Sequence, residues 1–148
     1  MEVFMESNDT IYLLKECDAG SKMAVTSIDE VMDRVRDSNM KELLRESREH
    51  HEQLGNDIHS QLMKHHSEEK DPNPMAKGMS WLKTNMKMGV DDSDATVADL
   101  ITDGCHMGVK SLHKYLNQYE AADKSAKDLC NRLISIEESL CKGMEKYL

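Results

Sequence analysis

Aromatic residues, glycine and proline are all scarce in this chain of 148 residues. It has one Trp, one Phe, seven Gly and two Pro, and aromatic residues make up 4% of the sequence. Met is abundant, with 12 copies, so the core must be built from Leu, Ile, Val, Met and Ala, which favours helices over sheets. Both prolines lie close together, at 72 and 74, and the rest of the chain is free to form long helices.

Basic residues and long apolar runs are also lacking. Lys and Arg number 19 against 28 Asp and Glu, a net charge of -9, which disfavours binding to nucleic acid or to an anionic membrane surface. No segment has the apolar length of a membrane helix, and MEVFMESND at the start lacks the basic and apolar parts of a secretion signal. The four cysteines show no disulfide spacing. We expect a cytoplasmic protein that binds neither membrane nor nucleic acid.

Catalytic motifs are missing as well. The sequence contains no phosphate-binding loop, no nucleophile elbow and no Cys-x-x-Cys pair. The sequence therefore disfavours an enzymatic function and indicates no catalytic residue.

Four long windows carry apolar residues at intervals of three and four, the spacing of amphipathic helices. They predict helices over residues 9–36, 39–66, 94–119 and 125–147. At or near the start of each of the last three windows lies a residue that can cap a helix, followed three residues later by an acid; these residues are Asn39, Thr96 and Ser125. In the second window the predicted buried face consists of Met40, Leu44, Ser47, His51, Leu54, Ile58 and Leu62.

The junctions between the windows predict how the helices connect. Short junctions join the first helix to the second and the third to the fourth, so each pair should form an antiparallel hairpin. The link over residues 67–93 is much longer, contains both prolines, and includes a short amphipathic helix over about 75–88. We therefore predict an all-α fold, a single domain over residues 1–148, with a ferritin-like four-helix bundle of two hairpins joined by this crossover.

Two stretches also resemble a known family. GMSWLKTNMKMGVDDSD and TVADLITDGCHMGVKSLHKYLNQYEAADKSAKDL resemble an uncharacterised bacterial branch of the ferritin-like superfamily, and the resemblance covers residues 9–148. It implies a ferritin-like bundle and does not specify a reaction.

A ferritin-like fold raises the possibility of a di-iron site, and the residues test it. Such a site needs inward-facing Glu-x-x-His motifs on two helices, but only His106 has an acid three residues before it, Asp103. At about 100° per residue both side chains point away from the apolar stripe of their helix. The sequence therefore predicts no complete metal site and no resident cofactor.

The segment RESREHHEQLGNDIHSQLMKHH carries five of the seven histidines. Most of its charged residues lie away from the apolar stripe and indicate a solvated helix surface. His51 is the exception, because it lies within the stripe of the second helix, as Glu137 does in the fourth. Both lie about 14 or 15 residues beyond a hairpin turn, so we expect them to meet near the middle of the bundle.

Two interpretations of this pair stay open. His51 and Glu137 could be a hydrogen-bonded pair that fixes the register of the helices, or a non-standard site for iron or another divalent metal, with Asp18 as a third ligand. Trp81 and Met88 of the crossover face away from its other methionines, which indicates an apolar patch for a homodimer or another protein partner. We expect a non-catalytic bundle that acts through self-association or protein contacts, and the alternative is a ferritin-like metal-binding or redox protein.

Overall fold

The computed structural model describes residues 2–65 and 93–148, with side chains from residue 8 onward. These residues form four α-helices and no strand: α1 (Glu2–Met32), α2 (Ser38–Lys64), α4 (Asp94–Gln118) and α5 (Lys124–Met144), followed by the 3-10 helix η1 (Glu145–Tyr147). The prediction of an all-α chain with four long helices is confirmed. Residues 67–92 of the predicted crossover, including its short helix over 75–88, lie outside the described residues.

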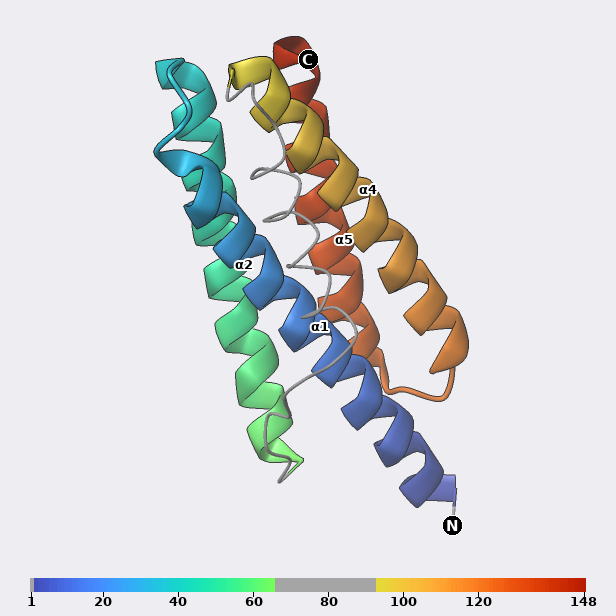
Figure 1. The fold of residues 1–148 in the computed structure, drawn as a ribbon. Helices are drawn as coiled ribbons and strands as arrows, with labels where there is room; N and C mark the ends of the chain where they lie inside the picture. Colours follow the sequence, from blue (N-terminus) through green and yellow to red (C-terminus); the bar gives the residue numbers. More distant parts are fainter. Residues whose placement is uncertain (1, 66–92) are drawn as a thin grey trace.

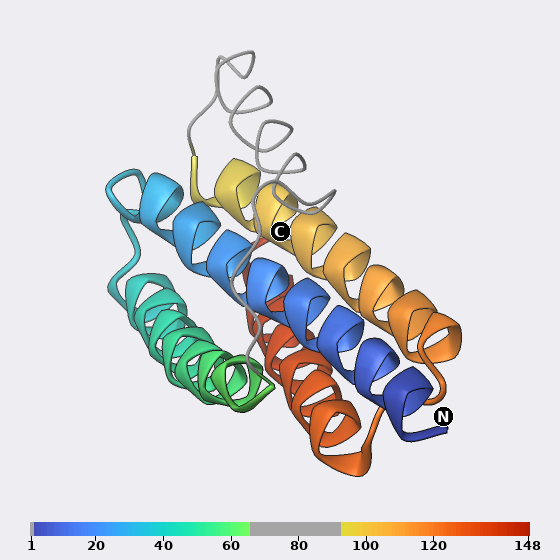
Figure 2. The ribbon, with the colours of Figure 1, turned by 90° about the horizontal axis from the view of Figure 1, so that it is seen from below.

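Four helices pack as two hairpins, α1 with α2 and α4 with α5 (Figure 1). Between the hairpins, α2 packs on α5, and α1 packs on both α4 and α5, so that α2 and α4 lie diagonally opposite (Figure 2). The end of α2 and the start of α4 lie at opposite ends of the bundle (Figure 1). Both predicted hairpins are therefore present.

Helix α1 differs most from its predicted range, because it begins at Glu2 rather than at Asp9. Asp9 was expected to mark the start, but its Oδ2 instead accepts a hydrogen bond from the backbone N–H of Ala121, at 3.0 Å. The helix also ends earlier, at Met32, and residues 33–37 form the turn to α2. A polar residue caps a helix only when its side chain accepts a hydrogen bond from a backbone N–H in the first turn of that helix.

The predicted caps of the other three helices were wrong by two or three residues. The capping residues are Asp37, Ser93 and Asp123, each with an extended backbone and a side chain that accepts the N–H three residues later. Each junction contains several residues with suitable side chains, and the one with the extended backbone becomes the cap. Asn39, Thr96 and Ser125 lie inside the first turn of their helices.

Each hairpin turn is held by a side chain of the other hairpin. The carboxylate of Asp94, the first residue of α4, accepts hydrogen bonds from the backbone N–H groups of Arg36 and Asp37, at 2.8 and 3.0 Å. At the other end of the bundle, the Thr10 hydroxyl accepts the N–H of Asp123 at 2.8 Å. These bonds satisfy turn backbone that the helices leave without partners.

Two separate apolar clusters fill the bundle, one toward each end. On α2, one cluster contains Met40 and Leu44, and the other begins at Leu54. The residues between them are polar or small, and the buried ones include Asp18, Ala19, Gly20, Ser21, Ser47, His51, Gly108 and Glu137. A polar layer therefore crosses the middle of the bundle, and it contains the pair that the sequence singled out.

Candidate functional site

His51 and Glu137 meet in this middle layer, and the predicted contact between them is confirmed. Each residue lies three or four positions from buried apolar residues of its helix and therefore points inward. His51 is 0% exposed and Glu137 is 6% exposed. The distance from Nε2 of His51 to Oε1 of Glu137 is 3.8 Å. That separation is too long for a strong direct hydrogen bond, so the two groups face each other but neither serves as the other's hydrogen-bond partner.

The second ring nitrogen of His51 is firmly held. Its Nδ1 lies 2.8 Å from the backbone carbonyl oxygen of Ser47 and 3.3 Å from the Ser47 hydroxyl. A carbonyl oxygen can only accept a hydrogen bond, so Nδ1 carries the proton and donates it. In the neutral ring Nε2 is therefore the acceptor, and it is buried without a hydrogen-bond partner.

Glu137 brings a carboxyl group into an apolar interior. Burial raises its pKa above the ordinary value of 4.5, and the His51 ring opposes this shift. Its Oε2 is also buried without a hydrogen-bond partner. Room for the carboxylate comes from Gly108 on α4, where a Cβ atom would lie 3.1 Å from the Glu137 Cδ and would overlap Oε2.

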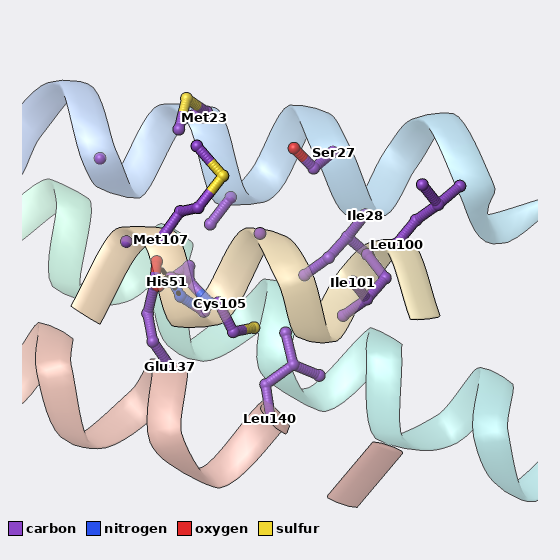
Figure 3. Close-up of a pocket in the computed structure, with 14 residues that line it drawn as sticks. Met23, Ser27, Ile28, His51, Leu100, Ile101, Cys105, Met107, Glu137 and Leu140 are labelled. Carbon is purple, nitrogen blue, oxygen red and sulfur yellow. Dashed lines mark ion pairs between the residues drawn. The ribbon is translucent and has the colours of Figure 1, made fainter. Parts of the chain in front are cut away.

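A pocket of about 70 Å³ lies above this pair, between α1 and α4 (Figure 3). Its walls are mainly apolar, and His51 and Glu137 supply polar groups on the side of α2 and α5. Met107 also lines the pocket and is 52% exposed, so the pocket reaches the surface. The complete lining is Gly20, Met23, Ala24, Ser27, Ile28, His51, Leu100, Ile101, Gly104, Cys105, Met107, Gly108, Glu137 and Leu140.

Glycine creates the pocket, and this is the feature that the sequence analysis missed. A Cβ atom at Gly104 would meet nothing within 4 Å, because the wall of α4 is hollow there. Gly104 and Gly108 lie four residues apart on the apolar stripe of α4, a spacing that could have indicated a recess on that face. On α1 the facing residues are Gly20 and Ala24, which are also small.

Cys105 on α4 belongs to a potentially reactive residue type. Its thiol lines the pocket, and burial together with the charge of Glu137 raises its pKa far above the usual range. The thiolate, which is the nucleophilic form, is therefore strongly disfavoured. This environment suits a packed side chain better than a catalytic one.

Asp18 does not complete a metal site with the pair. It is 6% exposed, its Oδ2 lies 3.0 Å from the Lys22 ammonium, and it lines a different depression between α1 and α2 that it shares with His51. Within residues 2–65 and 93–148, no three His, Cys, Asp or Glu side chains lie close enough together to hold a metal ion.

Asp103 and His106 lie on the surface, as predicted. His50 and His59 are also exposed. His106 has one contact that the sequence did not indicate, because its Nε2 lies 3.0 Å from the Cys141 sulfur on α5. His106 is exposed on α4 and Cys141 is buried on α5, so this contact crosses from one helix of the hairpin to the other.

Comparison with family models, with curated proteins and with solved structures found no match to this chain. Among the helices that the structure describes, none has an apolar stretch long enough to span a bilayer. The function must therefore be argued from the site alone.

Proposed function

We propose that this chain is a non-catalytic helical bundle that binds a small, mostly apolar molecule in the pocket between α1 and α4. One observation carries this proposal: an apolar recess of about 70 Å³ ends on two buried polar atoms without partners, Nε2 of His51 and Oε2 of Glu137. Small-molecule sites are typically apolar hollows with a few convergent polar groups. The strongly raised pKa of the Cys105 thiol supports binding rather than covalent chemistry.

Xenon tests this proposal directly, because it occupies apolar cavities regardless of polar contacts. Methionine methyl groups labelled with carbon-13 report its entry, since Met23 and Met107 both line the pocket. We expect saturable shifts of these two methyl signals under xenon pressure. Met63 is 51% exposed on α2 and does not line the pocket, so it serves as the internal control. Equal, non-saturating shifts of all three signals would contradict the proposal.

A metal site is the second candidate, favoured by the same two atoms. Nε2 of His51 and the Glu137 carboxylate are ligand types that iron and other divalent metals accept, but they supply two residues where such ions take four to six ligands, and water would supply the rest. Metal analysis of protein purified without an affinity tag, before and after anaerobic addition of ferrous iron, tests this. Near-integral metal that disappears in both His51→Ala and Glu137→Ala variants would support a metal-binding or redox protein.

Self-association is the third proposal. Its predicted patch, with Trp81 and Met88, lies outside the described residues, but Met107 adds an exposed apolar side chain on α4. Sedimentation equilibrium measures the mass directly. A homodimer that dissociates in the Met107→Lys variant would place the contact at this face, and a dimer that persists would place it elsewhere.

The ferritin-like connection and the cytoplasmic location are also proposals. Support for the first comes from α2 and α4, which are diagonal and run in the same direction, so that the end of α2 and the start of α4 lie at opposite ends of the bundle (Figures 1 and 2). Support for the second comes from four buried free cysteines, which suit a reducing compartment. A crystal structure that traces residues 66–92 tests the connection, and cell fractionation tests the location.

A further inference from the structure

The polar floor of the pocket is formed by hydrogen-bond acceptors. The bond from Nδ1 of His51 to the Ser47 carbonyl assigns the ring proton to Nδ1, which leaves Nε2 as an acceptor. An ionised Glu137 adds two further acceptor oxygens. Nε2 and Oε2 are both buried and without partners, so the floor requires a group that donates hydrogen bonds.

The charge of the site selects among donors. The residues that line the pocket include no Lys and no Arg, and His51, in the neutral form with Nε2 as acceptor, brings no positive charge to the carboxylate 3.8 Å away. A buried carboxylate without a positive partner is costly, and burial accordingly raises the Glu137 pKa. A cation brought by the ligand would restore the balance, and the net charge of -9 on the chain attracts cations from solution.

The walls limit the rest of the ligand. They consist largely of aliphatic and sulfur-containing side chains, among them Met23, Ile28, Ile101 and Leu140 (Figure 3). A volume of about 70 Å³ corresponds to about five to seven water-sized groups at the roughly 10–15 Å³ that each needs. A short alkyl chain fits this description.

We propose that the ligand is a small primary alkylammonium, whose three N–H donors meet Nε2 of His51 and the two carboxylate oxygens of Glu137 while its alkyl chain packs between α1 and α4. An ammonium group has three donors and no acceptor, which matches a floor of three acceptors. An alcohol can donate only one hydrogen bond, and a carboxylate would add a second negative charge. This inference rests on the proposed binding function and specifies the chemistry of the ligand.

Four probes of similar size test the head group: n-butylammonium, n-butanol, its isomer methyl propyl ether, and butyrate. The ether keeps an acceptor oxygen but cannot donate. Binding is followed by the Met23 and Met107 methyl signals. We expect n-butylammonium to bind at least about tenfold more tightly than the ether, since each hydrogen bond to a charged group contributes that much or more. Butyrate should bind most weakly.

The variants Glu137→Leu and Glu137→Gln test whether the preference comes from this carboxylate. Both should abolish the advantage of n-butylammonium over the ether, and Glu137→Gln keeps the shape of the side chain if Glu137→Leu fails to fold. Glu138→Gln is the matched control, because it removes the same charge from the neighbouring, exposed residue of α5. The control should keep the full preference.

The possible outcomes separate this inference from the function on which it rests. If xenon binds but the ether or butyrate binds as tightly as n-butylammonium, the head-group assignment is wrong and the apolar pocket stands. If neither xenon nor any probe shifts Met23 and Met107, the binding function itself fails. If Zn²⁺ displaces n-butylammonium at lower concentration and the displacement depends on Glu137, the floor is a metal site and the assignment is overturned.

Discussion

Glu137 places a carboxyl group in the interior of the bundle, and its surroundings compensate the cost only in part. The facing His51 nitrogen is 3.8 Å away, and Oε2 has no hydrogen-bond partner. Desolvation dominates this balance, so the pKa of Glu137 is raised. Folding stability therefore depends on pH through this residue.

The sign of that dependence follows from proton linkage. Between the ordinary pKa of about 4.5 and the raised pKa of the folded protein, Glu137 binds more protons in the folded state than in the unfolded state. Its contribution to stability is therefore present at low pH and decreases as pH rises toward the folded pKa. The amide of Glu137→Gln does not titrate. We expect wild-type stability relative to this variant to fall by about 1.4 kcal/mol for each unit by which the pKa is raised.

Urea denaturation from pH 4 to pH 8 measures this difference. Glu16 also has a pKa raised by burial, and its contribution cancels in the comparison because both proteins contain it. A difference between wild type and Glu137→Gln that stays constant over this range would contradict the assignment of a raised pKa to Glu137.

At the scale of the helices, α4 shows why glycine positions are hard to interpret from sequence. Gly104 and Gly108 lie on the same stripe, but one faces empty pocket and the other faces the Glu137 carboxylate. The stripe itself predicted which side of α4 turns inward. What each glycine faces depends on α1 and α5, which no local pattern specifies.

Alanine at these two positions should have opposite effects. Gly104→Ala adds a methyl group where a Cβ meets nothing within 4 Å, so the better helix propensity of alanine should stabilise the protein by about 1 kcal/mol. Gly108→Ala forces the Glu137 carboxyl group to move, and overpacking should cost about 1–3 kcal/mol. Thermal unfolding of the two variants, each the control for the other, checks this. Equal stabilisation by both substitutions would mean that the Glu137 carboxyl group does not need the space left by the missing side chain at Gly108.

The helix faces were far more predictable than the helix ends. All seven positions predicted as the buried face of α2 are buried, and they are the only buried residues of that helix. The meeting of His51 and Glu137 was also predictable, because equal distances from two hairpin turns place residues at one level. The caps at Asp37, Ser93 and Asp123 were not, since several neighbouring polar residues could have capped equally well and tertiary contacts decided.

For the whole molecule, the two hairpins are joined by reciprocal bonds at their turns as well as by the core. Asp94 of α4 holds two N–H groups of the turn between α1 and α2. Thr10 of α1 holds the turn between α4 and α5. Local sequence gives no sign of these bonds, because the partners are separated by 57 to 113 residues.

Removing one of these bonds tests their contribution. Asp94→Ala should lower the free energy of unfolding by about 1–3 kcal/mol, because it leaves two turn N–H groups without their acceptor. Asp99→Ala, an exposed acid one turn further along α4, is the matched control and should change stability by less than about 0.5 kcal/mol. Denaturant unfolding that gives the same small change for both variants would show that the turn is held by other contacts.

The polar layer divides the apolar core into two clusters, and the pocket lies between this layer and the cluster that contains Ile28, Ile101 and Leu140. A bundle selected only for stability would place an apolar residue at 137, where leucine could join the two clusters without leaving a buried oxygen unpaired. Packing alone therefore does not call for a glutamate at this position, and the proposed binding function gives it a role.

The free energy of unfolding of Glu137→Leu at pH 7 tests this account most directly. Relief of the unpaired buried carboxyl group should raise it by about 1–3 kcal/mol above wild type. The exposed substitution Glu138→Leu controls for the change in helix propensity. A loss of about 2 kcal/mol or more in Glu137→Leu alone would show that the pair holds the bundle together, and would contradict the claim that Glu137 serves a ligand.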